Sequence, residues 1–227
     1  MAQRDYILRM FEEMSRALAQ IIYHRQIKDY RAAHDLIDEQ IRQTLGMGGS
    51  FLLALSDDAL VSMLTTLGRL NAEKCWLVAT LLKIEGDIYE EEQDESRSYH
   101  CWLKAGNLFL EALYAQNQKL EIEEVAEVDE LWEKLRDYEL PLRTRQLLFW
   151  YFEHTGRYDK AEDMLFDILE AEDGESLEPG AEMAEVREQG EAFYARLMGK
   201  SDAALKAGNF SRAEIGESLE RLHKLLI

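Results

Sequence analysis

Proline and glycine are scarce in this chain, with two prolines and 13 glycines among 227 residues. Both residues interrupt helices, whereas the frequent leucine, alanine, glutamate and methionine favour them. Valine is also sparse, and no run of alternating β-branched residues bounded by turn signals occurs, so strands are not expected. The composition therefore predicts an all-α fold.

Long apolar runs and cysteines are scarce as well. No stretch approaches the 18 apolar residues of a membrane-spanning helix, and acidic residues come too early in the chain for a signal peptide. The only cysteines, Cys75 and Cys101, are too few for a disulfide framework or a metal site, and we expect buried free thiols. These absences predict a soluble cytoplasmic protein without a membrane partner.

Positive charge is in short supply, because 26 Lys and Arg stand against 45 Asp and Glu, for a net charge of −19. Residues 1–50 are neutral and residues 194–227 carry +2, so residues 51–193 carry −21. Such a field repels phosphate backbones and anionic lipid surfaces, which argues against binding to nucleic acid or membrane. Two interpretations stay open: the acidity keeps the protein soluble, or it attracts a basic partner.

Motifs for catalysis, cofactor binding and metal binding are absent. None of the five histidines belongs to a His-Glu-x-x-His pattern, and there is no Gly-x-Ser-x-Gly elbow. The glycine-rich stretch 46–50 lacks the lysine of a phosphate-binding loop and reads as a connector. His34 and Asp38 share a helical face, and we expect a solvated pair there. We therefore predict no catalytic, cofactor-binding or metal-binding residues and no enzymatic activity.

Apolar residues recur every three or four positions through most of the chain, which is typical of amphipathic helices. They predict about nine or ten helices and one further helical turn at 202–207. We interpret 1–227 as a single α-helical repeat domain with sub-units 1–50, 51–172 and 173–227. The helices are expected at 4–23, 29–45, 57–67, 72–92, 96–115, 123–138, 141–154, 158–171, 180–199 and 212–226.

One hairpin, at residues 142–172, carries a recognisable pattern: an aromatic residue, then Gly-x-Tyr-x-x-Ala, then a large apolar residue. The residues are Phe152, Gly156, Tyr158, Ala161 and Leu165. Glycine permits the tight turn, and alanine lets the two helices approach each other. The pattern resembles the tetratricopeptide repeat, a family of paired antiparallel helices of about 34 residues.

Weaker copies of the pattern, and the opening of the chain, extend this resemblance. Asp5-Tyr6-Ile7-x-Arg9-Met10 is similar to the start of an uncharacterised bacterial family of tetratricopeptide-like proteins. The resemblance implies a divergent superhelix of stacked hairpins. The weaker copies contain Tyr30, Ala33 and Ile37; Gly86, Tyr89, Trp102 and Ala105; and Gly208, Phe210 and Ala213.

The resemblance also implies a function, because tetratricopeptide proteins mostly bind peptides along a concave face lined by first helices. We therefore expect a non-catalytic protein- or peptide-binding scaffold, with a partner that is basic. An alternative is a self-assembling protein that forms a homodimer through its N-terminal hairpin, 4–45. A helical enzyme or small-molecule binder is a third hypothesis. The expected groove residues are Lys83, Asp87, Glu90, Arg143, Gln146, Trp150 and Glu153.

Overall fold

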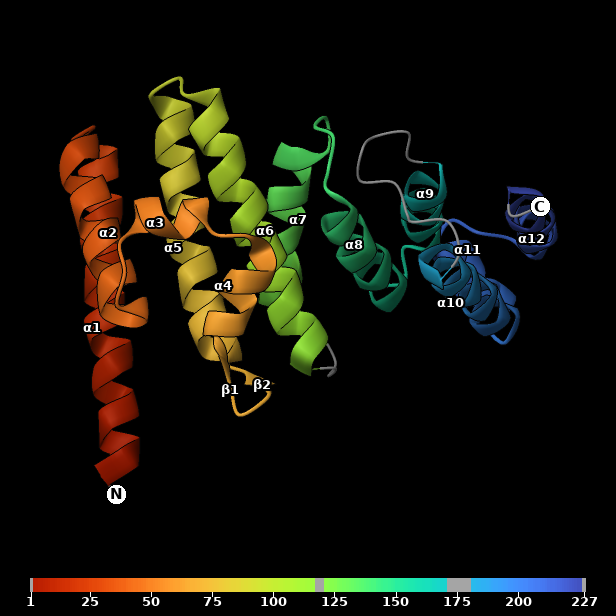
Figure 1. Ribbon diagram of the computed structural model, residues 1–227, viewed down its shortest axis with the longest axis horizontal. Helices are drawn as coiled ribbons and strands as arrows, with labels where there is room; N and C mark the ends of the chain where they lie inside the picture. The colour runs from red at the N-terminus through yellow and green to blue at the C-terminus, as the bar shows by residue number, and fades with distance from the viewer. Residues whose placement is uncertain (1, 117–120, 171–180, 226–227) are drawn as a thin grey trace. The chain divides into compact units, whose positions relative to one another are not determined.

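The computed structural model describes residues 2–116, 121–170 and 181–225, and over these residues the protein is all-α (Figure 1). The described residues form twelve helices and one two-stranded sheet, which confirms the predicted fold class. The chain divides into two compact units, residues 1–137 and residues 138–227. The boundary falls inside the stretch 51–172 that we had treated as one sub-unit.

Unit 1 contains seven helices and the sheet among its described residues. Its elements are α1 (Ala2–Gln26), α2 (Tyr30–Leu45), α3 (Gly49–Ala54), α4 (Asp57–Met63), β1 (Thr65–Thr66), β2 (Arg69–Leu70), α5 (Ala72–Glu91), α6 (Glu95–Gln116) and α7 (Ile122–Leu135).

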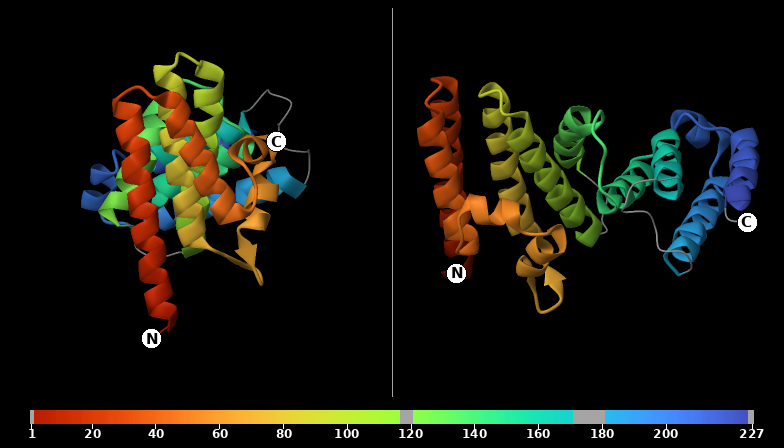
Figure 2. Two further views of the ribbon diagram at one scale, coloured as in Figure 1. Left: turned by 90° about the vertical axis from the view of Figure 1, so that its left-hand side faces the viewer. Right: turned by 45° about the horizontal axis from the view of Figure 1, so that its top comes forward.

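The long helices of unit 1 lie side by side (Figures 1 and 2). α1 pairs with α2, α2 contacts α5, α5 pairs closely with α6, and α7 packs on α6. Helix α5 lies between α2 and α6, and ten of its residues are buried, including charged ones. The apolar core contains the fully buried residues Ile21, Ile37, Ile41, Leu81 and Phe109.

The segment after α4 corrects one expectation. We predicted a helix to Leu67 and no strands, but α4 ends at Met63 and an antiparallel hairpin pairs Thr65 with Leu70. Leu67 and Gly68 both have positive φ, 52° and 75°. Two consecutive left-handed residues match a type I′ turn, which closes a two-residue hairpin and cannot continue a helix.

Ser and Asn favour the N-cap position, and the sequence places Ser56 and Asn71 directly before the helices expected at 57 and 72. Ser56 and Asn71 cap α4 and α5 by accepting hydrogen bonds from Ala59 N (3.2 Å) and Lys74 N (3.0 Å). For the helix expected at 96–115, Ser96 was the cap that we predicted, and this was wrong: α6 begins at Glu95, and Asp94 accepts the hydrogen bond from Arg97 N. An aspartate is as good an N-cap as a serine.

Unit 2 is a second helical unit built around the predicted hairpin. Its elements are α8 (Leu142–His154), α9 (Tyr158–Leu169), α10 (Ala181–Met198), α11 (Asp202–Ala207) and α12 (Arg212–Leu225).

The α8–α9 turn of unit 2 forms as its sequence predicts. Gly156 has a φ of 76°, and Ala161 is fully buried. α10 packs on α9 and α12. The Tyr194 hydroxyl on α10 donates to Glu162 on α9 at 2.7 Å, which gives this buried ring a polar partner.

Candidate functional site

The three predicted groove residues of unit 1 lie on α5, and Lys83 is the first. Its ammonium group donates to Glu127 at 2.7 Å and to Glu130 at 2.6 Å, both on α7. Burial by itself would lower the pKa of Lys83, but these two hydrogen bonds outweigh that effect and raise the pKa above its ordinary value. Lys83 is therefore a charged link between α5 and α7.

Asp87, one turn further along α5, joins three other helices. Its carboxylate accepts from Arg25 of α1 at 3.0 Å and from the Trp102 indole of α6 at 3.0 Å. Lys134 of α7 forms an ion pair with it at 3.4 Å. Only 7% of Asp87 is exposed. The partners on α1, α6 and α7 offset the energetic cost of burying its charge.

Glu90 completes the set at the exposed edge. It accepts a hydrogen bond from Lys134 at 2.8 Å, and the Lys134 ammonium lies 4.3 Å from the centre of the Trp102 ring. Burial would lower the pKa of Lys134, but the hydrogen bond to Glu90 and the charge of Asp87 raise it. All three predicted groove residues of α5 thus bind side chains of the chain's own helices.

The other four predicted groove residues lie on α8 in unit 2. Arg143 is exposed, and Gln146 and Trp150 are half-buried. Trp150 stacks on His154 with 4.3 Å between ring centres. Glu153 holds Arg196 of α10 through two hydrogen bonds, at 2.5 and 2.8 Å, so its charge is neutralised within the unit.

The seven residues are therefore divided between the two units, three in unit 1 and four in unit 2. A groove shared by both sets stays a prediction. Within unit 1, the side chains that were expected to receive a partner already have partners on α1, α6 and α7.

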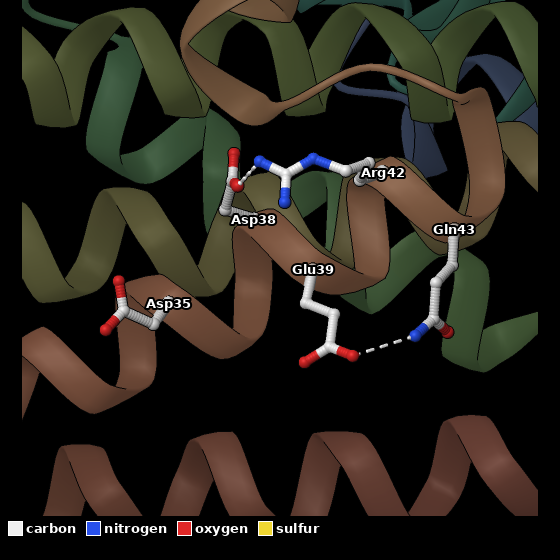
Figure 3. A pocket seen from close by; sticks show the side chains of 5 residues that line it. All are labelled: Asp35, Asp38, Glu39, Arg42 and Gln43. Atoms are coloured by element: carbon white, nitrogen blue, oxygen red, sulfur yellow. Dashed lines mark hydrogen bonds and ion pairs between the residues drawn. The ribbon is translucent and has the colours of Figure 1, made fainter.

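A pocket that we did not predict lies beside α2 (Figure 3). It has a volume of about 640 Å³ and is lined mainly by acidic and amide side chains. Among the described side chains, Glu39 accepts a hydrogen bond only from the Gln43 amide, at 3.1 Å. Asp35 is exposed and has no hydrogen bond or ion pair with any residue that the structure describes. The lining residues are Asp35, Asp38, Glu39, Arg42 and Gln43.

Asp38 and Arg42 also line this pocket. They are paired with each other, and Asp38 also accepts from Gly49 N at 2.7 Å, which ties α2 to the start of α3. The carboxylates of Asp35 and Glu39 are the lining acids that no described cationic side chain contacts. The signal for this site was in the sequence, because Asp35, Glu39 and Gln43 recur every four residues and so share one face of a helix.

His34 lies on α2 as well, but it faces the interior rather than forming the solvated pair with Asp38 that we expected. Its Nε2 lies 3.0 Å from Glu92, and its Nδ1 lies 3.4 Å from Glu85, both on α5. Its ring stacks on Tyr89 at 4.5 Å. Burial by itself would lower the pKa of His34, but the bonds to the two glutamates raise it above its ordinary value.

The described residues contain no group of three or more His, Cys, Asp or Glu that is arranged to hold a metal ion. Cys75 and Cys101 are free and buried, as predicted, and burial raises the pKa of Cys75 to about 12 and that of Cys101 as well. Both thiols therefore stay protonated at neutral pH. Among the described helices, none is long and apolar enough to cross a membrane.

The structure thus defines the class: an all-α protein of packed helices with charged pairs in its interior. Comparison with family models then identifies the family. A family of unknown function, DUF6483, matches residues 1–226, so the chain belongs to this family. No curated protein and no solved structure matches the chain.

Proposed function

We propose that this protein is a non-catalytic binding scaffold that recognises a basic protein or peptide. The observation that supports this most directly is the pocket beside α2, where Asp35 and Glu39 line a volume of about 640 Å³ and, among the described side chains, neither is paired with a cation. A lysine or arginine side chain supplies the missing charge and the hydrogen-bond donors.

The contrast with the rest of unit 1 strengthens this proposal. Arg25, Lys83 and Lys134 each contact two carboxylates, so the interior uses its cations to balance its own acids. With a net charge of −19, the molecule as a whole attracts cationic ligands from a distance. The α2 pocket is the concave site in which we propose that such a cationic ligand binds.

The finer architecture is also a proposal: we infer divergent tetratricopeptide-like hairpins. The α8–α9 turn supports this, with Gly156 in the left-handed region and Ala161 fully buried between helices. In such an arrangement Trp150 serves as an apolar anchor for a bound peptide. The two buried free thiols support the proposal of a reducing cytoplasmic location.

Binding to a labelled oligolysine peptide tests the proposed function by fluorescence anisotropy at low and moderate salt. We expect Asp35→Asn combined with Glu39→Gln to weaken binding about tenfold, since two ion pairs at an exposed site contribute roughly 1 kcal/mol together or slightly more. The affinity of the unaltered protein falls as salt screens the charges.

The matched control removes the same charge elsewhere. Glu217→Gln combined with Glu220→Gln neutralises two exposed acids of α12 and should leave affinity close to that of the unaltered protein. Equal weakening by the two double variants would show that net charge alone governs binding and would contradict a site at α2. An oligoglutamate probe is expected not to bind.

A further inference from the structure

His34 places a titratable ring between α2 and two carboxylates of α5. Its Nδ1 lies 3.4 Å from Glu85 Oε1, and its Nε2 lies 3.0 Å from Glu92 Oε2. Only the protonated imidazole carries a hydrogen on both ring nitrogens, so only that form offers a donor and a positive charge to each glutamate. Burial by itself would lower the pKa of His34, but the bonds to the two glutamates raise it.

Glu85 is the acid that depends most on this ring. It is 7% exposed, and its Oε2 is buried without a hydrogen-bond partner among the described residues. His34 is also the one described cationic side chain within ion-pair distance of Glu85. A buried carboxylate without a counter-charge is costly, so loss of the proton from His34 leaves a negative charge here uncompensated.

The other charged groups near the ring keep their charge around neutral pH. Tyr89 of α5 stacks on the ring at 4.5 Å, and burial raises the pKa of its hydroxyl. The Arg97 guanidinium of α6 lies 4.3 Å from the centre of the Tyr89 ring, and arginine stays protonated. On α2 itself, Asp38 is paired with Arg42. Histidine is the residue type in this cluster that titrates near neutral pH, so His34 sets its change of charge.

The pocket beside α2 lies close to this ring on the same helix. Asp35, which lines the pocket, directly follows His34 (Figure 3). Glu39 is five residues further on than His34, which corresponds to roughly 7.5 Å along the helix axis. The ring and the two acids without a described cationic partner are therefore separated by distances on the order of 10 Å.

The start of α3 brings Glu85 towards the same pocket. A Cβ at Gly49 would lie 3.8 Å from Glu85 Oε2 and 3.8 Å from Asp38 Oδ1, and Asp38 is one of the residues that line the pocket. The carboxylate that His34 neutralises and a lining carboxylate thus lie on either side of one glycine. A change of charge at His34 and Glu85 is therefore transmitted to the pocket through a short distance.

We propose that the proton on His34 regulates the binding of a basic ligand at the α2 pocket: the protonated ring weakens binding, and the neutral ring strengthens it. This inference rests on the proposed function, because the pocket must first bind a cation. The ligand's positive charge and the proton occupy different sites but repel each other. Linkage is reciprocal, so a bound ligand lowers the proton affinity of His34 by the same factor.

The separation of the two charges sets the size of the effect. Two unit charges about 10 Å apart change an affinity by about twofold in a water-like dielectric and by more than about tenfold at the lower dielectric near a protein surface. Salt reduces the effect, because the Debye length is about 10 Å at 0.1 M. We expect about a threefold change for a ligand at the exposed acids of the pocket.

Fluorescence anisotropy with a labelled, N-acetylated oligoarginine tests the proposal at low salt, at about pH 6 and about pH 9, since arginine keeps its charge throughout this range. The unaltered protein should bind about threefold more tightly at the higher pH. His34→Gln is neutral at both values, so its affinity at the lower pH should already equal that at the higher pH. His100→Gln, which removes an exposed histidine of α6, should keep the threefold change. Circular dichroism verifies that each protein is folded at both pH values.

A second measurement uses the unaltered protein and needs no variant to fold. The His34 ring is titrated by NMR with and without oligoarginine, and the probe should lower the proton affinity of this ring about threefold. The proposal is overturned if the probe leaves that proton affinity unchanged, or if His34→Gln keeps the pH dependence of the unaltered protein. Failure of Asp35→Asn combined with Glu39→Gln to weaken oligoarginine binding is a different result, which overturns the α2 pocket itself and this regulation with it.

Discussion

At the scale of single residues, unit 1 balances the charges that it buries. The buried Lys104 shows this well: it donates to Leu55 O at 2.6 Å and to the half-buried Asp57 at 3.1 Å, and Asp57 also accepts from Asn107 at 2.6 Å. Together with Asp87 and Lys83, this means that the polar side chains of α5 and α6 hold neighbouring helices. Such residues look like ligand-binding groups in the sequence, although their partners are internal.

His34 gives a pH-dependent prediction. Its pKa is raised in the folded protein, so its contribution to stability is fully present below the unfolded pKa of about 6.5 and is lost as pH rises through the folded pKa. We expect His34→Gln to destabilise by about 1 kcal/mol at pH 6 and by less at pH 9. Urea unfolding followed by circular dichroism at each pH measures the difference.

The charged groups around His34 are Glu85 and Glu92, with the Tyr89 hydroxyl and the Arg97 guanidinium close by, since Arg97 lies 4.3 Å from the Tyr89 ring. His100→Gln is the control, because His100 is exposed and its Nδ1 lies 2.6 Å from the Ser96 carbonyl oxygen of its own helix. A destabilisation by His34→Gln that does not change with pH would contradict this role.

At the scale of elements, the close packing of α5 on α6 depends on one glycine. A Cβ at Gly86 would lie 2.5 Å from Trp102 Cδ1 and 2.6 Å from Nε1. Trp102 is only 3% exposed and is held by Asp87, so it has little freedom to move. The glycine is therefore required by helix packing even though it weakens the helix itself.

Gly86→Ala should destabilise the protein by about 2 kcal/mol, because the cost of overpacking exceeds the gain in helix propensity of about 1 kcal/mol. Gly106→Ala on α6 is the matched control: its Cβ would meet only Leu135 Cδ1, at 3.8 Å. That variant should be neutral or stabilised by up to about 1 kcal/mol. Thermal unfolding of both variants checks the prediction, and a stable Gly86→Ala protein would contradict it.

At the scale of the whole molecule, each unit has an excess of acidic residues, whose charges repel one another within the unit. Unit 1 has 15 basic and 26 acidic residues, and unit 2 has 11 and 19, so their net charges are −11 and −8. Screening reduces repulsion within a compact state. We therefore expect raising NaCl from 10 to 200 mM to increase the melting temperature by about 2–4 °C, equivalent to roughly 1 kcal/mol. A lower melting temperature at high salt would show that the ion pairs dominate instead.

Much of the fold was predictable because its signals are local. Apolar spacing located every long helix, and Ser56, Asn71 and Gly156 marked ends and a turn that the structure confirms. The hairpin at Thr65–Leu70 was missed because Leu is a poor residue for a left-handed turn position, so Leu67 gave no turn signal. The short helix α3 was missed for lack of length, since six residues show no clear period.

The candidate site was harder to predict because it depends on which helix covers which. The sequence by itself determined the helices, the acidic charge, the scarcity of reactive groups and the free state of the two thiols, since these follow from local propensity and composition. Only the tertiary structure decided that Lys83 and Asp87 face α7, α1 and α6, while Asp35 and Glu39 face solvent. All four are charged residues on amphipathic helices, and burial distinguishes them only after the helices have packed.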